Sequence, residues 1–412
     1  MVSMQRLKWK SDFDKSVLTL NFEKRGWVKA TGDEDWNIYW ANPWTVKQIF
    51  NPETGFRLGE TQLLNHFPNH LELTRKDLMV KNIKRFRREM EKEGNPLAEK
   101  DERGDFLYME IVPMTYLLPG DYTIFVEEFR RKPDEMWIMK PTARAQGKGI
   151  FLVNKLNQLK KWATNSKLPF QSLNLREAYV ISRYIEKPLL VGSKKFDLRL
   201  YVLVTSYRPL KVWMNSGGFA RFCTEKYTPD IAELDNMMIH LTNVAVQKGA
   251  EDYNEQHGGK WSIKNLKFYL EMTRGREPTE KCFDGIRNIV YISLKSVQSV
   301  IINDKHCYEV YGFDVLIDEH LKPWLIEVNA SPSLTASTEI DRTLKMGVIH
   351  DTFQIVVPPD WLDENSKHGA NTSKETQVGN FSLIIDEASA EPPAKGGRPD
   401  KQVRRGNAAL WR

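Results

Sequence analysis

Three oxygen-bearing side chains, Asp314, Glu327 and Asn329, interrupt an otherwise apolar stretch of the sequence. The runs 313–317 and 323–328 alternate with period two and flank a polar turn, which predicts a β-hairpin. Within each strand the alternation puts these polar residues on the face opposite to the apolar residues. If the two strands pair across the turn, Asp314 lies opposite Glu327.

The chemistry of this set depends on whether the three oxygens converge. Two carboxylates and one amide oxygen make the kind of ligand set that Mg²⁺ uses when substrate phosphates complete its coordination. A site for a metal and a nucleotide is therefore one interpretation. The other is that these residues form the solvated outer face of an ordinary hairpin.

A second group of charged residues alternates along a predicted strand at 196–206. Lys195, Asp197 and Arg199 share one strand face, because they lie two residues apart and the residues between them are apolar. An ion network with neighbouring strands would satisfy these charges without any function. The same pattern suits a ribose hydroxyl flanked by cations that bind phosphate. The sequence leaves both interpretations open.

The loop 141–149 connects two further predicted strands and contains Gly147 and Gly149. It lacks the first glycine and the final Ser or Thr of a Walker A motif, and no helix pattern follows it, so it is not a P-loop. A glycine-rich hairpin can still cover phosphates with backbone N–H groups, and Lys140 in the preceding strand would add a point charge. A plain hairpin turn is the alternative.

A helix is predicted to begin near Thr74, an N-cap candidate with Asp77 three residues later. Apolar residues at helical spacing define one face of this helix. Four cations lie on nearly the opposite face: Lys81, Lys84, Arg85 and Arg88. This basic face is either a solvated surface or a docking surface for an acidic polymer.

Composition divides the chain into four parts. Residues 1–73, dense in aromatic residues and turn signals, predict a small N-terminal domain. Residues 74–190 hold the basic helix and the glycine-rich loop, and residues 191–360 hold the long strand and the hairpin. Periodicity fades after that, so we expect residues 361–412 to be mostly disordered. The helices predicted between the long strand and the tail are 263–272, 282–302 and one around 340–345.

The composition limits the class of protein. The chain has 412 residues, 41% of them apolar, which is enough for two or three packed domains. No apolar run approaches the roughly 18 residues of a membrane span, so we expect a soluble, intracellular protein with no membrane partner. Three cysteines without metal-ligand spacing indicate neither a disulfide framework nor a zinc site. Lysine and arginine (60) exceed aspartate and glutamate (54) only mildly, and we expect no nucleic-acid partner.

Five motifs follow one another along the chain: WIMKPTARAQGKGIF, YVISRYIEKP, KKFDLRLYVLV, HLTN and YGFDVLIDEHLKPWLIEVNASPSL. Together they resemble the tubulin–tyrosine-ligase-like family over roughly residues 25–360. Within this family the sequence is most similar to the polyglutamylases, which include the catalytic subunit of a multi-subunit complex. The resemblance implies an α/β (α+β) fold of the ATP-grasp type. Its nucleotide cleft would lie between a central and a C-terminal subdomain. A small N-terminal domain would precede these two subdomains in the sequence.

The resemblance also implies roles for individual residues. Asp314, Glu327 and Asn329 become Mg²⁺ ligands, in agreement with the argument from the strand faces. Arg199 becomes catalytic together with Glu327, as the cation that stabilises charge developing on the transferred phosphoryl group. The residues implied to bind ATP are Lys140, Gln146, Gly147, Arg183, Tyr184, Ile185, Glu186, Lys195, Phe196, Asp197, Thr242 and Asn243. Those implied to bind free glutamate are Arg221, Lys260 and Lys345.

The activity implied by the resemblance is that of a tubulin polyglutamylase, a ligase that requires ATP and Mg²⁺. Such an enzyme activates an acceptor carboxylate as an acylphosphate and then joins free glutamate to it. The acidic tails of tubulin in microtubules would be the acceptor, which agrees with the basic helix face. Subunits of a polyglutamylase complex are implied as partners, and the cytoplasmic cytoskeleton, the cilium or flagellum axoneme and the basal body as locations. The alternatives are a glycylase, a tyrosine-ligase-type enzyme and a non-catalytic microtubule-binding scaffold.

Overall fold

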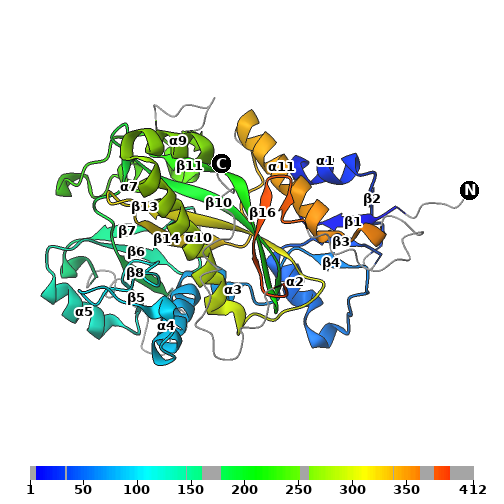
Figure 1. Ribbon diagram of the computed structural model, residues 1–412, viewed down its shortest axis with the longest axis horizontal. Coiled ribbons are helices and arrows are strands. Elements are labelled where there is room, and N and C mark those ends of the chain that lie inside the picture. The colour runs from blue at the N-terminus through cyan, green and yellow to red at the C-terminus, as the bar shows by residue number, and fades with distance from the viewer. Residues whose placement is uncertain are drawn as a thin grey trace, which may run out of the picture.

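The computed structural model describes residues 6–32, 35–144, 146–159, 178–250, 259–336, 338–361 and 375–389. In this part of the chain three β-sheets form, with helices packed around them. Figure 1 shows the sheets side by side, with the N-terminal sheet (blue) at one end, a small sheet (cyan) at the other and the largest sheet between them. No helix of the described residues is long and apolar enough to cross a bilayer.

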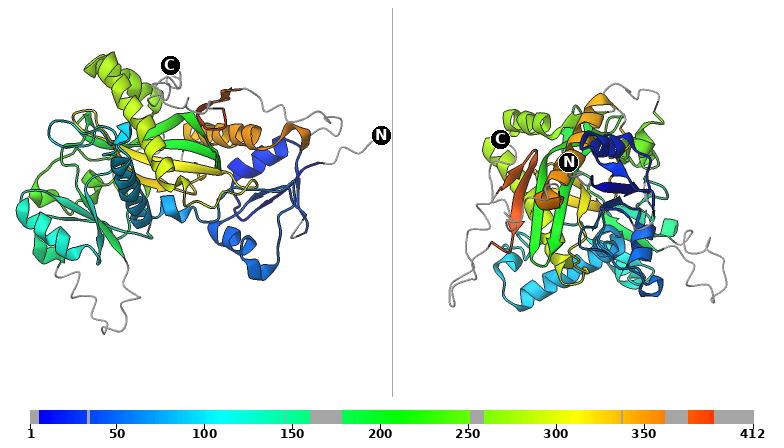
Figure 2. Two further views of the ribbon diagram at one scale, coloured as in Figure 1. Left: turned by 60° about the horizontal axis from the view of Figure 1, so that its bottom comes forward. Right: turned by 90° about the vertical axis from the view of Figure 1, so that its right-hand side faces the viewer.

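The N-terminal sheet consists of four short parallel strands in the order β2-β1-β3-β4. Its elements are β1 (Lys8–Ser11), α1 (Ser16–Lys24), β2 (Val28–Lys29), β3 (Ile38–Trp40), α2 (Pro43–Ile49), β4 (Leu63–Leu64) and α3 (Leu71–Thr74). The ring of Phe22 stacks on Trp9 with a centroid distance of 4.6 Å and also contacts Phe353, near the end of the last helix. Aromatic packing therefore joins α1 to a helix more than 300 residues later in the chain, and Figures 1 and 2 show these two helices side by side.

The small sheet is antiparallel throughout and has the order β5-β8-β6-β7. Its strands are β5 (Thr115–Leu118), β6 (Trp137–Pro141), β7 (Phe151–Val153) and β8 (Tyr179–Arg183), and α5 (Tyr122–Arg131) covers it. Phe125 of α5 meets Trp137 edge to face at 5.0 Å, which anchors the helix on the sheet.

The helix α4 (Lys76–Lys92) packs against α10 (Arg276–Gln298) and touches β8. Its predicted start at Thr74 is wrong, because Thr74 ends α3 and Arg75 is the N-cap. Asp77 forms no capping box and instead accepts two hydrogen bonds from Arg75, at 2.7 and 2.8 Å. The first residue of α4 is therefore Lys76.

The largest sheet has eight strands: six follow the order β14-β13-β10-β11-β16-β15, β9 pairs with β10, and β12 pairs with β11. Its strands are β9 (Leu190–Val191), β10 (Lys194–Tyr207), β11 (Leu210–Phe222), β12 (Lys260–Ser262), β13 (Glu309–Ile317), β14 (Pro323–Asn329), β15 (Gln377–Val378) and β16 (Phe381–Asp386). The predicted strand at 196–206 is confirmed as β10, which lies at the centre of the sheet and is buried along most of its length. This position gives its side chains two neighbouring strands to contact.

Helices accompany the largest sheet: α7 (Met237–His240), α8 (Val244–Gln247), α9 (Ile263–Arg274), α10 and α11 (Glu339–Val356). The predicted helices at 263–272 and 282–302 are confirmed, and α10 begins six residues earlier than predicted, at Arg276. The helix predicted around 340–345 is much longer, because α11 continues to Val356. Buried apolar residues of α10, such as Ile286, Ile289 and Val290, join the main core beneath the sheet.

The expectation of a mostly disordered tail is wrong for residues 375–389. There β16 pairs antiparallel with β11, and β15 pairs with β16. Phe381 is fully buried, and Asp351 of α11 accepts a hydrogen bond from the backbone N–H of Asn380 at 2.8 Å. Short strands between polar segments give a weak period, so the fading pattern of the sequence did not reveal them. The remainder of the predicted tail lies outside the described residues.

Candidate active site

A cleft lies between the small sheet and the largest sheet. The space between its walls, open solvent included, is about 1100 Å³. Residues of α4, β6, β8, β10, α7 and the hairpin β13–β14 form its walls. The predicted site residues that line it are Lys140, Gln146, Gly147, Arg183, Tyr184, Ile185, Lys195, Asp197, Thr242, Asn243, Asp314 and Glu327. Residues from distant parts of the sequence therefore converge on one cavity.

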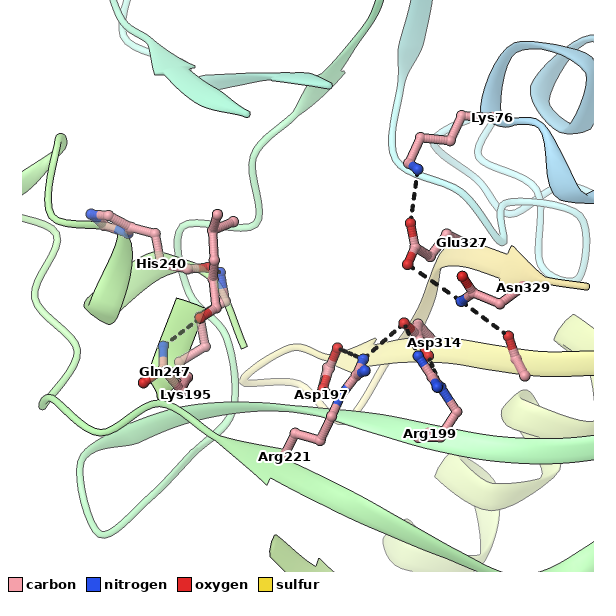
Figure 3. Close-up of polar contacts among 12 residues, drawn as sticks. Lys76, Lys195, Asp197, Arg199, Arg221, His240, Gln247, Asp314, Glu327 and Asn329 are labelled. Carbon is pink, nitrogen blue, oxygen red and sulfur yellow. Dashed lines mark hydrogen bonds and ion pairs between the residues drawn. The ribbon is translucent and has the colours of Figure 1, made fainter. Parts of the chain in front are cut away.

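The predicted hairpin is confirmed, and its register brings the predicted metal ligands together. Asp314 of β13 pairs directly with Glu327 of β14, and Gly312 pairs with Asn329. The amide nitrogen of Asn329 donates to the Gly312 carbonyl at 3.4 Å and to Glu327 Oε1 at 3.3 Å. Figure 3 shows these three side chains at one end of the hairpin.

Asp314 is 2% exposed and lies between two arginines. Arg199 donates to both of its oxygens, at 2.5 and 3.0 Å, and Arg221 Nη2 lies 2.8 Å from Oδ2 (Figure 3). Burial alone would raise the pKa of Asp314, but Arg199 and Arg221 outweigh burial and hold this pKa well below its usual value. The carboxylate is therefore ionised at neutral pH.

The donor chemistry of Asp314, Glu327 and Asn329 fits a hard divalent cation. Two charged carboxylates and one amide are oxygen ligands of the kind that Mg²⁺ prefers. In the described part of the chain no three His, Cys, Asp or Glu side chains group as metal ligands, so the set depends on Asn329 for its third donor. Glu327 forms an ion pair with Lys76 at 2.9 Å, which keeps a cation beside the set.

Four cations surround these carboxylates. Lys76 and Lys140 approach from the small-sheet side, and Arg199 and Arg221 approach from the largest sheet. Burial lowers the pKa of Lys140 to about 8, although the charge of Glu327 opposes this shift. The cations exceed the carboxylates Asp197, Asp314 and Glu327 by one. This excess of positive charge favours the binding of a polyanion such as a triphosphate.

Lys195 sits at the other end of the cleft, in a chain of hydrogen bonds. Its ammonium group donates to Tyr184 Oη at 2.9 Å and to the carbonyl oxygen of His240 at 3.0 Å. Tyr184 Oη is also 2.8 Å from His240 Nδ1 (Figure 3 shows Lys195 and His240). Burial lowers the pKa of Lys195 to about 8. The contacts leave Lys195 fixed at the cleft wall as a hydrogen-bond donor.

The segment 183–186 connects the small sheet to the largest sheet. Glu186 Oε1 accepts a hydrogen bond from the backbone N–H of Met136 at 2.9 Å, so this side chain ties the connection to β6. Phe196 points away from the cleft: it is 1% exposed, belongs to the main core and packs on Phe222 at 5.2 Å. Its side chain is therefore not brought to the other predicted nucleotide residues.

The glycine-rich loop bends closely over α8. Gln146 and Gly147 have φ angles of 64° and 76°, and a Cβ at Gly147 would lie 3.0 Å from Val246 and 3.4 Å from Asn243. A side chain at Gly147 would push the loop away from the wall that holds Asn243. The backbone of the loop thus closes the cleft above Asn243.

The residues predicted to bind glutamate form a cluster beside the metal set. Arg221 and Lys260 are paired across β11 and β12. Lys260 Nζ and Lys345 Nζ both lie 3.0 Å from Asp341 Oδ2, and Lys345 also donates to the carbonyl oxygen of Thr335 at 2.7 Å. Arg221 itself also donates to Asp197, at 2.7 Å from Nε to Oδ1. Two lysines therefore share one carboxylate close to the arginines.

Lys76, His240 and Asp341 are among the residues of the site that our sequence prediction missed. Lys76 lies three and seven residues before Met79 and Ile83, so its helical spacing could have placed it on the inner face of α4. Asp341 lies four residues before Lys345, a spacing typical of an ion pair on a helix. Both spacings are so common in helices that they did not single out Lys76 or Asp341 as site residues.

The basic helix face is smaller than predicted. Lys84 donates to the carbonyl oxygen of Thr115 at 2.6 Å, and Arg85 donates to that of Ser296 at 2.8 Å. These two cations therefore bind α4 to its neighbours. Lys81 and Arg88 are exposed and remain available to an acidic partner.

Comparison with known proteins identifies what this chain is similar to. A model of the tubulin-tyrosine ligase family matches residues 56–365. A Tetrahymena thermophila protein named "Probable alpha-tubulin polyglutamylase Ttll1" is 60% identical over 391 residues, which cover 94% of each chain. The Bos taurus "Probable tubulin polyglutamylase TTLL9" is 40% identical over 96% of this chain and 86% of its own length. The Homo sapiens "Tubulin polyglutamylase TTLL5" is 36% identical over 78% of this chain and 24% of its own length.

Proposed function

The chain belongs to the tubulin-tyrosine ligase family, whose fold is of the ATP-grasp type, and we propose that it is a tubulin polyglutamylase. It would use ATP and Mg²⁺ to join free glutamate to acidic side chains in the tails of tubulin. The names of relatives that match almost the whole chain support this substrate.

We attribute the selection of glutamate over other amino acids to Lys260 and Lys345. Lys260 and Lys345 both contact one carboxylate, that of Asp341, so these three side chains together carry a net positive charge. Arg221 lies beside Lys260 in the sheet, and its charge is paired with Asp197 and Asp314. Glutamate carries two carboxylates, whereas glycine and tyrosine carry one. A cluster with net positive charge next to the reaction centre supports a dicarboxylate as the incoming amino acid.

The cleft would hold ATP with its base near Lys195 and its phosphates near Lys140. This orientation follows from the charges, because the carboxylates and four cations lie at the hairpin end and the neutral tyrosine and histidine at the other. The segment 183–185, Thr242 and Asn243 would contact the base and sugar, and the backbone at Gln146 and Gly147 would cover the phosphates. Asp314, Glu327 and Asn329 would hold Mg²⁺, which would neutralise phosphate charge when bound.

The reaction would proceed in two steps. An acceptor carboxylate of tubulin attacks the terminal phosphorus of ATP, which forms an acylphosphate and releases ADP. The amine of glutamate then attacks the acyl carbon, forms the amide bond, and releases phosphate and a proton. Arg199 would stabilise the charge on the transferred phosphoryl group, because its guanidinium is held by Asp314 and faces the metal set.

We also propose where the enzyme acts and which proteins it binds. Microtubules of the cytoskeleton, and among them those of the cilium or flagellum axoneme and the basal body, would be the place of action. Subunits of a polyglutamylase complex would be its partners. The exposed cations Lys81 and Arg88 support an electrostatic contact with acidic tails, which salt would weaken.

A competition assay tests this function. The tagged chain is purified from the cells that make it, so that bound subunits remain, and is incubated with microtubules, ATP and Mg²⁺. Labelled glutamate, glycine and tyrosine are supplied in separate reactions. We expect incorporation of glutamate alone, dependent on ATP. Incorporation of glycine or tyrosine instead, or of no amino acid while the chain still binds microtubules, would contradict the proposal.

A further inference from the structure

A buried polar cluster lies where the N-terminal sheet meets the hairpin of the active site. His66 and Glu309 are 1% and 0% exposed, and His66 Nδ1 lies 2.9 Å from Glu309 Oε1. The backbone N–H of Phe67 donates to Glu309 Oε2 at 3.1 Å, and the hydroxyl of Tyr311 donates to the same carboxylate. None of these residues lines the cleft, and nothing in the proposed chemistry uses them.

The His66 ring links Glu309 to Ser331 through its two nitrogens. Burial lowers the pKa of His66 to about 3, so its ring is neutral and carries one N–H. Burial also raises the pKa of Glu309 to about 7, so the N–H of His66 lies on Nδ1 or on Nε2 according to the protonation of Glu309. His66 Nε2 lies 3.2 Å from the hydroxyl of Ser331, and the two groups can form a hydrogen bond in either tautomer.

Ser331 lies two residues beyond Asn329, in the segment that leaves β14. A hydrogen bond to Ser331 therefore restrains the end of the strand that carries Asn329 and, two residues before it, Glu327. Pro332 is buried in the same segment, and its Cβ lies 3.1 Å from the place that a Cβ on Gly312 would occupy. The segment thus folds back over β13 at the position opposite Asn329.

A second series of contacts, through His70 and Thr74, connects the same cluster to the start of α4 at Lys76. The rings of His66 and His70 lie 5.2 Å apart, and His70 Nδ1 is 3.1 Å from Thr74 Oγ1. Thr74 is two residues before Lys76, which forms the ion pair with Glu327. The N-terminal segment 66–76 therefore contacts the hairpin end from both sides, and α3 packs against β14.

We propose that His66 is a positioning residue for the metal site, because it holds Ser331 and thereby the end of β14 that carries Asn329. Glu309 restrains the ring orientation of His66 through the contact of 2.9 Å between His66 Nδ1 and Glu309 Oε1. The N-terminal part of the chain would thus set the affinity for metal and nucleotide without touching either. The inference rests on the proposed function only in taking Asp314, Glu327 and Asn329 as the metal ligands.

Three variants test this role. Ser331→Ala removes the hydroxyl that forms a hydrogen bond with His66 and leaves the buried pair of His66 and Glu309 intact. His66→Asn keeps a donor near the position of Nδ1 for Glu309 but cannot reach Ser331. Ser333→Ala is the matched control, because Ser333 is an exposed serine two residues farther along the same segment.

The main measurement is metal binding. The affinity for Mn²⁺, a spectroscopic substitute for Mg²⁺, is measured by electron paramagnetic resonance in the presence of a non-hydrolysable ATP analogue. We expect Ser331→Ala and His66→Asn each to weaken Mn²⁺ binding by about three- to tenfold, the effect of one hydrogen bond. The double variant should be no weaker than His66→Asn alone, because both changes break the same contact. Ser333→Ala should bind as the unaltered protein does.

Two results would overturn the inference. One is Mn²⁺ affinity in Ser331→Ala equal to that in Ser333→Ala. The other is a lowered melting temperature in His66→Asn with unchanged Mn²⁺ affinity, which would make the contact structural only. Neither measurement needs glutamate or tubulin. Failure of the proposed function would instead appear as absent glutamate transfer by a chain that still binds Mn²⁺ and the nucleotide analogue.

Discussion

Lys345 offers a direct test of how the site selects glutamate. Its ammonium group lies 3.0 Å from Asp341 Oδ2, so it is placed to hold a carboxylate by a charge-assisted hydrogen bond. Lys345→Met removes the charge and keeps most of the apolar stem. A substrate carboxylate held in the same way would lose about 1.5–3 kcal/mol of binding free energy. That loss corresponds to a rise of about 10- to 150-fold in the KM for glutamate.

Steady-state kinetics with labelled glutamate check this value, with ATP and tubulin in excess. Lys264→Met is the matched control, because Lys264 is an exposed lysine on the neighbouring helix α9. The KM for ATP should change by less than about twofold in both variants. The reasoning would be refuted if Lys345→Met left the KM for glutamate unchanged, or raised the KM for ATP by the same factor.

Three further predictions concern the nucleotide end of the site. Lys140 and Lys195 have pKa values of about 8, so both lose their positive charge as pH rises through 8. We therefore expect kcat/KM for ATP to be constant below pH 8 and to fall above it. Asp314→Asn breaks a buried ion pair, and we expect chemical denaturation to give a free energy of unfolding about 3 kcal/mol lower, with glutamate transfer abolished. Gly147→Ala places a methyl group 3.0 Å from Val246 at a positive φ, which should cost about 1 kcal/mol and raise the KM for ATP about fivefold while the KM for glutamate stays constant. A flat pH profile, a fully stable Asp314→Asn protein or an unaltered KM for ATP would each contradict the corresponding contact.

The sequence predicted the hairpin well, because its signal is local. Period-two alternation and a short polar turn specify which residues face each other, and the pairing of Asp314 with Glu327 followed from that alone. The long strand β10 was equally clear. The ion network, one of the two interpretations of its charged face, is confirmed, since Asp197 pairs with Arg221 and Arg199 pairs with Asp314. The other interpretation, contact with ribose and phosphates, stays a prediction.

Contacts between distant segments could not be predicted from the sequence. The ion pair of Lys76 with Glu327 joins α4 to β14, and no local sequence pattern predicts a contact between two residues so far apart in the chain. The cluster of His66 and Glu309 depends in the same way on how the N-terminal sheet docks. The tail strand β16 was missed because its partner β11 lies about 170 residues earlier in the chain, so only tertiary pairing stabilises it.

In the proposed mechanism the hairpin holds the metal and the nucleotide for glutamate transfer to tubulin. Intact mass spectrometry of tubulin, after reaction with ATP, Mg²⁺ and glutamate, tests this role of the hairpin. Glu327→Gln is compared with Glu319→Gln, a change at a partly exposed glutamate in the turn of the same hairpin. We expect added glutamate residues on tubulin from the unaltered protein and from Glu319→Gln, and none from Glu327→Gln. Equal additions by Glu327→Gln would refute this role.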